Sequence, residues 1–376
     1  MPCVGSRSNN LLPPEQALRE GRWVKLILGA SNQDLAAIED LAGIYSLAGV
    51  HCIDAAADGA VIAAVARGVA WAQRHGAAKP WLMVSLSDGE DPHFRKAWFD
   101  PQRCPADCRR PCERVCPALA IGLAATGQPG VLAERCYGCG RCLPACPLGL
   151  IEERSQVLDA AAVPALLARW QPQAVELHCQ PGRLEAFAAR LAQLRASGVA
   201  LRRVAVSMGP GMGSAVGSAV GAAASPQLAQ ALWQCFGLLR AAGYRPLWQL
   251  DGRPMSGDLG AMTARAAVQL LADLHDRLPP GPLQLAGGTN ASSLSVVAAQ
   301  PPAVQAAAAG VGFGGEARRR LQPWLLEAQQ RGARLLDCAD LWPVALAAAD
   351  VLVRPWLQRP AGFGSAVDEA PAAMGN

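Results

Sequence analysis

The stretch WVKLILGASNQDLAAIEDLAGIYSLAGVHCIDAAA (23–57) decides the fold. Its two ends are apolar runs with the character of strands, and its middle part, 32–50, carries apolar residues at helical spacing. A strand, a helix and a second strand in this order form a βαβ unit, in which the two strands are parallel. Helices cover both faces of a parallel sheet, which explains why both runs are almost continuously apolar.

The same alternation continues along the chain, and the sequence predicts eight strand–helix units. Eight regular units predict a closed (β/α)8 barrel, with an open, doubly wound α/β sheet as the alternative. The predicted strands are 23–31, 51–57, 81–87, 174–180, 203–209, 246–252, 282–290 and one within 303–315. The predicted helices are 32–50, 60–75, 156–170, 183–197, 227–242, 262–277 and 316–331.

A cysteine-rich segment divides the predicted barrel. The barrel is expected over 22–87 and 155–350, and residues 88–154 are an insertion after its third strand. A barrel loop accepts an insertion because the ends of the loop lie at the surface. An N-terminal segment, 1–21, precedes the barrel, and a disordered tail is predicted over 360–376.

Composition excludes several classes of protein. With 51% hydrophobic and 17% charged residues, the chain can bury a sizeable core. A net charge of +4, without a basic run, does not indicate a nucleic-acid partner. Residues 205–239 are uncharged, but prolines and glycines interrupt them, so no transmembrane segment is predicted. Thirteen cysteines without a signal peptide indicate the reducing cytoplasm and metal ligation.

The segment CYGCGRCLPACP (136–147) carries the strongest motif. Its four cysteines have the spacing of bacterial iron–sulfur proteins, with a proline after the last. Small residues between them let backbone N–H groups approach the sulfur atoms. A zinc site is the alternative, although zinc sites usually show two separated Cys-x-x-Cys pairs. The predicted ligands are Cys136, Cys139, Cys142 and Cys146.

A second quartet, CPADCRRPCERVCP (104–117), has wider gaps but ends in the same Cys-x-x-x-Cys-Pro pattern. The repeated ending predicts two half-modules, two clusters and crossed ligation, because the last cysteine of each run binds the other cluster. The wider gaps leave a 3Fe–4S form as an alternative to 4Fe–4S for the second cluster. The predicted groups are Cys136, Cys139, Cys142 with Cys116, and Cys104, Cys108, Cys112 with Cys146.

Several segments together carry a family resemblance. They are SNQDL (31–35), WLMVSLSDGEDPHFRKAWFDP (81–101), CERVCP (112–117) and ERCYGCGRCLPACPLGLIE (134–152). With them the chain resembles the cyanobacterial light-dependent period (LdpA) family over nearly its whole length. The resemblance implies an iron–sulfur protein that reports cellular redox state to the circadian clock input pathway, in association with clock and input-kinase proteins. All eight motif cysteines match the ligand pattern of that family.

Three functions remain open from the residues. A redox sensor would exchange electrons with a quinone or a ferredoxin-type carrier, whereas an oxidoreductase would bind a substrate or flavin in the barrel. A structural role, in which the clusters pin the insertion, is the third. An enzyme should place polar groups at the carboxyl ends of the strands, where they would otherwise only face solvent. The candidates are Ser85, Ser87, Asp88, Glu176, His178, Gln249, Asp251, Thr289 and Asn290. No known catalytic motif assigns a catalytic residue.

Two glycine-rich segments follow the last predicted strands, AGGTN (286–290) and GVGFGG (310–315). In many barrels the corresponding loops bind phosphate, because glycine exposes backbone N–H groups and a helix N-terminus adds a positive dipole. A flavin mononucleotide or a phosphorylated metabolite would fit such a site. The alternative is that these glycines serve only tight turns. The candidate cofactor-binding residues are Gly287, Gly288, Thr289, Asn290, Gly312, Gly314 and Gly315.

The segment DGEDPHFRKAWFD (88–100) leads from the third strand into the first cysteine quartet. We expect it to pack between the barrel mouth and the clusters. The alternative is a charged loop in solvent. Its candidates for coupling cluster state to the barrel are Asp88, Glu90, His93, Arg95 and Lys96.

Overall fold

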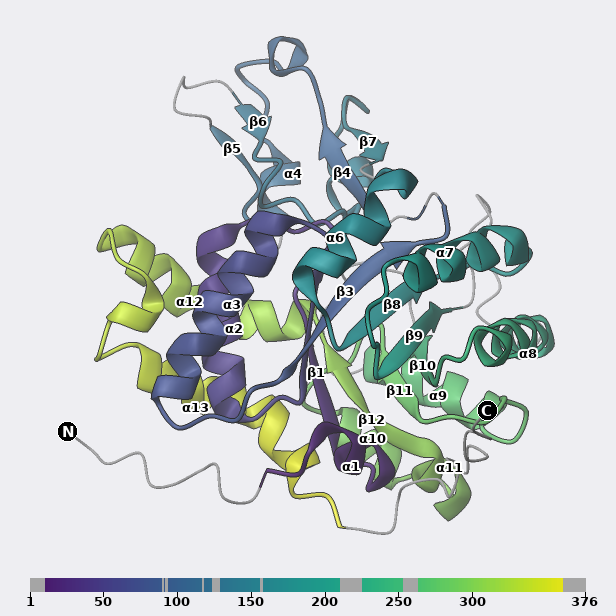
Figure 1. Ribbon diagram of the computed structural model, residues 1–376. Helices are drawn as coiled ribbons and strands as arrows, with labels where there is room; N and C mark the ends of the chain where they lie inside the picture. Colours follow the sequence, from purple (N-terminus) through teal and green to yellow (C-terminus); the bar gives the residue numbers. More distant parts are fainter. Residues whose placement is uncertain are drawn as a thin grey trace.

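The chain closes eight parallel strands into a barrel (Figure 1). The computed structural model describes residues 11–89, 91, 94–116, 118–123, 129–155, 158–209, 225–252 and 263–360. The barrel strands are β1 (Trp23–Ile27), β2 (Cys52–Ala56), β3 (Trp81–Ser87), β8 (Ala174–His178), β9 (Arg203–Met208), β10 (Pro246–Asp251), β11 (Leu283–Ala286) and β12 (Ala308–Phe313). The (β/α)8 prediction is confirmed, and the open sheet is wrong because β1 pairs with both β2 and β12.

Helices surround this barrel on the outside, as Figure 1 shows. The short helix α1 (Pro14–Arg19) lies at the amino-terminal end of the strands, and α13 packs against α2 and α12. The outer helices are α2 (Leu35–Ala48), α3 (Gly59–Arg74), α6 (Val163–Trp170), α7 (Leu184–Ala196), α8 (Ser225–Ala241), α9 (Ala264–Leu274), α10 (Ser293–Ala298), α11 (Pro302–Ala307), α12 (Gly315–Gln330) and α13 (Trp342–Leu357).

Every predicted strand and helix has a counterpart in the structure, and the last strand lies within 303–315 as predicted. The third strand has the predicted bounds, 81–87, and most other elements are shorter than predicted by a few residues. The segment 303–315, expected to hold the last strand, divides into helix α11 and strand β12. Its first half is rich in alanine, and Pro302 occupies the first helical position, so it has the composition of a helix start.

The cysteine-rich segment stands between β3 and α6. Its ends form an antiparallel pair, in which Arg95 lies opposite Ser155 and Trp98 opposite Glu152. A second small pair joins β5 to β6. Its elements are β4 (Arg95–Trp98), α4 (Pro111–Arg114), β5 (Ile121–Leu123), β6 (Pro129–Val131), α5 (Cys142–Ala145) and β7 (Glu152–Ser155). We call residues 88–157 the insert.

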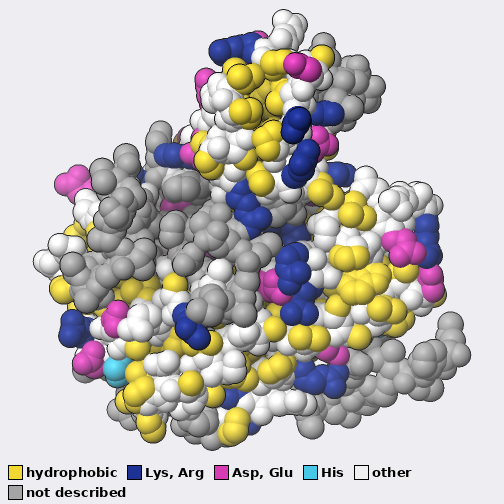
Figure 2. Space-filling view, turned by 180° about the vertical axis from the view of Figure 1, so that it is seen from behind, with side chains coloured by type: hydrophobic (Ala, Val, Ile, Leu, Met, Phe, Trp, Pro, Cys, Tyr) yellow, Lys and Arg dark blue, Asp and Glu magenta, His cyan; other side chains and the backbone are white. Residues whose placement is uncertain are grey.

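The insert rises from the carboxyl end of the barrel strands (Figure 1). Figure 2, seen from behind, shows it standing out from the barrel, with Lys and Arg side chains gathered around its base. The opposite end of the barrel is closed by apolar side chains, with Leu18 of α1 packed beneath Trp23, Met83 and Leu247. An apolar floor at one end leaves the carboxyl end as the place for a site.

We call the β4–β7 pair the neck of the insert. Because this pair already joins the two ends of the insert, we predict that the part beyond it can be removed. We expect a variant in which Asn-Gly replaces residues 99–151 to fold as a barrel without cluster absorbance, because Trp98 and Glu152 already face each other and Asn-Gly favours a two-residue hairpin. Circular dichroism and visible absorbance measure this.

A deletion of 88–155 is the matched control. It also removes Asp91 and Phe94, which are 0% and 5% exposed, so its melting temperature should fall below that of the shorter deletion. An aggregated product from the shorter deletion would contradict the prediction, since the cysteine-rich part would then belong to the folding core of the barrel.

Candidate iron–sulfur centre and barrel site

The structure brings together four sulfur atoms from both cysteine quartets. Ala97, Ile121 and Val131 line the same small, apolar cavity as these cysteines. We call this group the inner site, and it consists of Cys116, Cys136, Cys139 and Cys142. It takes three cysteines from the second motif and the last cysteine from the first, as the crossed arrangement requires.

The other four cysteines form the outer site, Cys104, Cys108, Cys112 and Cys146. Burial raises the pKa of the Cys104 thiol, and its neighbours Cys108 and Cys146 raise it further. Burial likewise raises the pKa of the Cys112 thiol, and Cys146 and Cys104 raise it further. Cys146 acts electrostatically on both Cys104 and Cys112, so the last cysteine of the second motif lies near the first motif, as the predicted crossed arrangement requires.

Backbone N–H groups point at the sulfurs in a repeated pattern. The amide of Ala120 lies 3.2 Å from Cys116 Sγ, and the amide of Leu150 lies 3.4 Å from Cys146 Sγ. Each amide is four residues after its cysteine, so the two half-modules share the same local geometry. Such bonds stabilise a thiolate, and hydrogen bonds to cluster sulfurs help to set the reduction potential.

Within each site, the sulfur atoms are too far apart to bind one metal ion together. Among the described residues, no three His, Cys, Asp or Glu side chains converge closely enough to hold a single metal ion. Each cysteine of a cubane binds a different iron, so its ligands need not converge in that way. The residues of both sites therefore fit iron–sulfur clusters by their donor atoms, their grouping and their N–H bonds.

The loop of the inner site rests on the barrel. Gln33 donates its backbone N–H to the carbonyl of Glu134 at 2.8 Å. The guanidinium of Arg318, on α12, lies 4.2 Å from the ring centre of Tyr137, between two inner-site cysteines, and also donates to the carbonyl of Leu28. Gly29 lies beside this contact with a φ of 104°, a backbone conformation that favours glycine. The loop after β1 and the start of α12 thus clamp the inner site.

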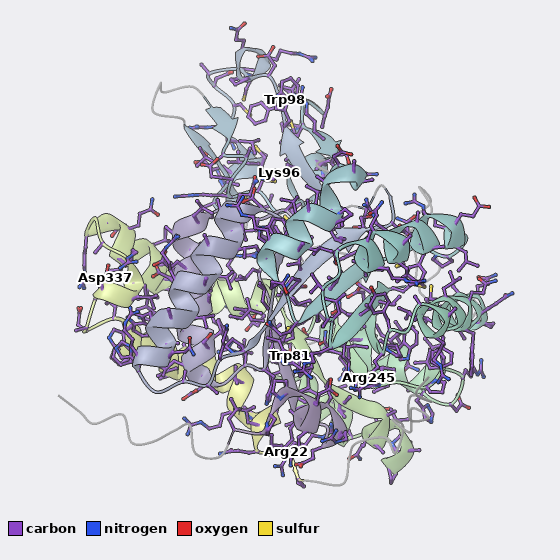
Figure 3. All side chains as sticks on the ribbon, viewed as in Figure 1. Arg22, Trp81, Lys96, Trp98, Arg245 and Asp337 are labelled. Atoms are coloured by element: carbon purple, nitrogen blue, oxygen red, sulfur yellow. The ribbon has the colours of Figure 1, made fainter. Side chains whose placement is uncertain are left out.

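Strand β4 makes a second connection. Lys96, at the junction of insert and barrel in Figure 3, donates to Gln33 Oε1 at 2.7 Å and to the carbonyl of Ala133 at 2.6 Å. The next residue, Ala97, directs its N–H to Cys136 Sγ at 3.3 Å. Of the predicted coupling residues, Lys96 therefore lies at the interface, whereas Arg95 pairs with Glu153 in the neck. Glu90 and His93 lie outside the described residues, as do residues 361–376 of the predicted tail.

A layer of charged and polar side chains fills the middle of the barrel. Lys25, which is 0% exposed, donates to Glu176 and to Gln249 Oε1, and lies 3.5 Å from Asp54 Oδ2. His178 Nε2 lies 3.1 Å from Glu176 Oε1. Of the predicted candidates, Ser85, Glu176, His178, Gln249 and Asp251 belong to this layer, which also contains Ser207 and Gln284.

Lys25 and Glu176 hold each other ionised, whereas the pKa of Asp54 shifts in the direction that favours its neutral form. Burial alone would lower the pKa of Lys25, but Glu176 and Asp54 raise it above its ordinary value, so the ammonium stays protonated. Burial would raise the pKa of Glu176, but Lys25 and His178 bring it well below its usual range. Burial, together with Glu176, raises the pKa of Asp54 to about 6. The layer is a coupled ion network shielded from water.

The predicted phosphate loops have a different arrangement from the one expected. Gly312 lies inside β12, opposite Lys25, not in a loop after the strand. Gly287 and Gly288 have φ values of 68° and 92°, as tight turns require. Thr289 donates to the carbonyl of Gly312, and Asn290 Nδ2 donates to Thr263 Oγ1 at 3.1 Å.

These bonds tie the β11 loop to its neighbours. Gly314 and Gly315 begin α12, where Glu316 occupies the first turn with its carboxylate paired to Arg319 and Arg320. An acidic residue already complements the positive end of that helix. Gly287 and Gly288 thus form a tight turn, Gly312 lies in a strand, and phosphate binding by these glycines stays a prediction.

Sequence reasoning missed Lys25, Asp54 and the Tyr137–Arg318 contact. A signal for the first two was present: a strand expected to be buried on both faces should be apolar, yet each of these strands carries a charge at its centre. Their partners lie far away in sequence, and only the closed barrel brings them together.

Loss of the central ammonium should destabilise the barrel. We expect Lys25→Met to cost about 3–5 kcal/mol in the free energy of unfolding, because it leaves buried carboxylates without their cation. Urea denaturation measures this.

The double variant Lys25→Met/Glu176→Gln should recover part of that loss, since it removes a charge on each side of the pair. An unfolding free energy unchanged by Lys25→Met would mean that water or a rearranged side chain compensates the carboxylates, contrary to the observed burial.

Crossed ligation predicts which cluster each cysteine supports. Cys146→Ser should remove about half of the iron by disrupting the outer site, although Cys146 belongs to the second motif. Cys116→Ser should disrupt the inner site instead. Electron paramagnetic resonance of the two variants distinguishes the remaining clusters and separates 3Fe from 4Fe forms; the same signal lost in both variants would contradict the crossed arrangement.

Comparison with known proteins agrees with this geometry. Residues 104–157 match the LdpA Fe-S cluster-binding domain, and residues 166–355 match the Light dependent period A C-terminal domain. Part of the chain, 66 residues, is 39% identical to an uncharacterized ferredoxin of Methanocaldococcus jannaschii, covering 18% of this chain and 43% of that protein. Among solved structures, the carboxyl transferase domain of Rhizobium etli pyruvate carboxylase aligns with a TM-score of 0.42 and 12% identity, over 94% of this chain and 50% of that one.

The most extensive similarity covers nearly the whole molecule. Over 366 residues the chain is 43% identical to Light dependent period A of Synechococcus elongatus, covering 96% of this chain and 97% of that protein. No helix among the described residues is long and apolar enough to cross a membrane. The chain belongs to the Light dependent period A family, and it carries the Fe-S cluster-binding domain of that family.

Proposed function

We propose that this protein senses cellular redox state by electron exchange at two iron–sulfur clusters and relays that state to the clock input pathway through its barrel. The contact between the inner-site loop and the barrel carries the proposal. Tyr137 and Arg318 stack, and Gln33 bonds to Glu134, so a change in the charge of the inner site acts directly on the loop after β1. One electron gained or lost changes that charge by one, without making or breaking a covalent bond in the protein.

The low dielectric of the interface makes such a change effective. Tyr137 and Arg318 are each 8% exposed, so water poorly screens the interaction between the Arg318 charge and a charge change at the inner site. The guanidinium of Arg318 holds the carbonyl of Leu28 as well, and a shift of this side chain would therefore move the end of β1. The proposed electron carrier is a quinone or a ferredoxin-type protein, and the proposed recipients of the signal are clock and input-kinase proteins.

Hydrogen–deuterium exchange of the oxidised and reduced protein tests the relay. We expect reduction to change exchange in residues 28–34 and in the first turn of α12, as well as in the insert. Arg318→Met should abolish the change in the barrel and keep both cluster signals in paramagnetic resonance, because Arg318 touches Tyr137 but no predicted ligand.

Arg319→Met is the matched control, since the neighbouring Arg319 pairs with Glu316 and is exposed. Exchange differences confined to the insert in the unmodified protein would overturn the relay through the barrel, whatever the clusters' potentials.

An oxidoreductase is the second proposed function, and the charged layer of the barrel favours it. The interior of such a barrel is usually packed with Val, Ile or Leu. Here it contains Lys25, Glu176 and His178 instead, which are residue types that serve as acids and bases in enzymes. In this function the barrel would bind a flavin or a phosphorylated substrate. Flavin absorbance in the purified protein, beside that of the clusters, would support it over the sensor.

A further inference from the structure

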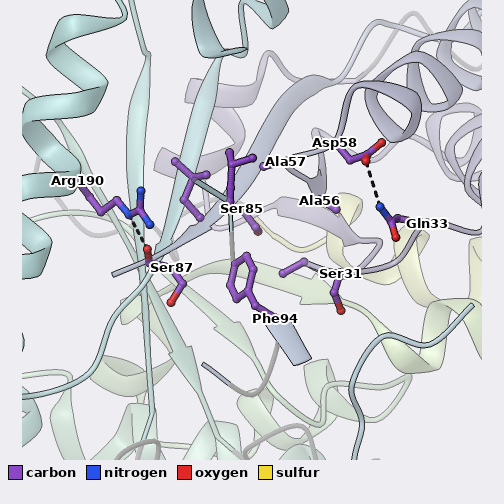
Figure 4. A pocket seen from close by; sticks show the side chains of 12 residues that line it. Ser31, Gln33, Ala56, Ala57, Asp58, Ser85, Ser87, Phe94 and Arg190 are labelled. Atoms are coloured by element: carbon purple, nitrogen blue, oxygen red, sulfur yellow. Dashed lines mark hydrogen bonds between the residues drawn. The ribbon is translucent and has the colours of Figure 1, made fainter. Parts of the chain in front are cut away.

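A cavity of about 350 Å³ opens at the barrel mouth beneath the insert. Figure 4 shows its walls: Ser31 from the loop after β1, Ala57 after β2, Ser85 and Ser87 of β3, and Arg190 of α7 surround the ring of Phe94. Small-molecule sites have volumes of roughly 300–1,000 Å³ and lie at the carboxyl ends of barrel strands. The cavity is separate from both cysteine sites and from the glycine loops after β11 and β12.

Arg190 supplies a buried positive charge to this cavity. Its side chain is 8% exposed and is held in place by two bonds, from Nε to the carbonyl of Ser87 and from Nη1 to Gln193 Oε1, each 2.7 Å. Neither bond neutralises the charge. Among the residues that the structure describes, no carboxylate lies within ion-pair distance of Arg190. Asp88 acts on Arg190 only electrostatically, and its carboxylate forms an ion pair with Arg183 at 3.5 Å.

Ser31 supplies an unused hydrogen-bonding group. The residue is 6% exposed, and its hydroxyl has no hydrogen-bond partner in the part of the chain that the structure describes. Buried polar groups almost always have one, so a partner is expected in the cavity that Ser31 lines. Asp58 lies across the cavity from Arg190 (Figure 4), and its carboxylate is already used by Gln33 and by the N-terminus of α3. The cavity thus has a positive charge at the Arg190 end, and the Asp58 carboxylate, held by neutral donors, lies at the opposite end.

We propose that this cavity binds a small organic oxyanion, a carboxylate or phosphate ester, with its charged group at Arg190. Its apolar body would pack on the face of Phe94, and a polar group at its other end would meet Ser31. A buried guanidinium without a carboxylate gains a charge-assisted hydrogen bond from such a ligand. This proposal goes beyond redox sensing and does not depend on it.

The position of Phe94 gives the ligand contact with the insert. Phe94 immediately precedes β4, and its ring also meets His178 of the charged layer edge-on, at 5.3 Å between centres. Ser85, at the floor of the cavity, donates to Asp54 at 2.7 Å. A ligand would therefore touch the insert on one side and the polar barrel interior on the other.

Calorimetric titration of the full-length, cluster-loaded protein tests the proposal. The probes are benzoate and phenyl phosphate, with neutral benzamide as the matched compound of the same shape. We expect at least one of the two anions to bind about tenfold more tightly than benzamide, as one charge-assisted bond would give. Arg190→Gln should remove this difference, whereas Arg195→Gln, an exposed position on the same helix, should preserve it.

Ala57→Phe provides a second variant, because it fills the cavity and leaves Arg190 and its bond to Ser87 in place. It should abolish binding of the anion even if Arg190→Gln folds poorly. Equal binding of benzamide and both anions, binding that survives Ala57→Phe, or no binding of either anion would each overturn the proposal.

Discussion

The antiparallel pairing of β4 with β7 is the constraint on which the arrangement of this protein depends. It brings the two ends of the insert together, so that β3 and β8 can remain neighbours in the barrel although a long segment separates them. Strand β4 and the residue before it make three contacts within four residues. Phe94 reaches the mouth cavity, Lys96 bonds to the loop after β1, and the amide of Ala97 points at Cys136. A shift of β4 would change all three contacts.

The charged layer is harder to explain by stability alone. Removing Lys25, Glu176 and Asp54 from water costs several kcal/mol for each ion, and apolar side chains of the same volume often stabilise a protein as well or better. Aliphatic side chains do fill the barrel below this layer, where Met83 and Leu247 pack against Leu18. The barrel thus changes from apolar to charged along its axis, and the charged end is the one that faces the insert. Such a gradient is what a site at the mouth requires.

Much of the fold could be predicted because it depends on local patterns. The strand 81–87 is a continuous apolar run between breakers, and the cysteine spacings predict an iron–sulfur domain, which the family match over residues 104–157 confirms. Where local signals compete, prediction failed: glycine-rich 310–315 suggested a loop, but pairing with β1 makes 308–313 a strand and places Gly312 within it. Lys25 and Glu176 are 151 residues apart in the sequence, and no local pattern could reveal that they meet.

The two contacts between the insert and the barrel differ in what they can transmit. Arg318 stacks on Tyr137 and responds to charge, because a guanidinium over a ring is held largely by electrostatics. Strand β4 is held by backbone pairing and by the packing of Phe94 on His178, so it responds to position. A charge change at the inner site would act first through Arg318, whereas a ligand in the mouth cavity would act first through Phe94. Both contacts converge on the loop after β1, through Leu28 and Gln33. That loop is therefore where a redox signal and a metabolite signal could be combined, since each would change the same few bonds, and by thermodynamic linkage each would alter the response to the other.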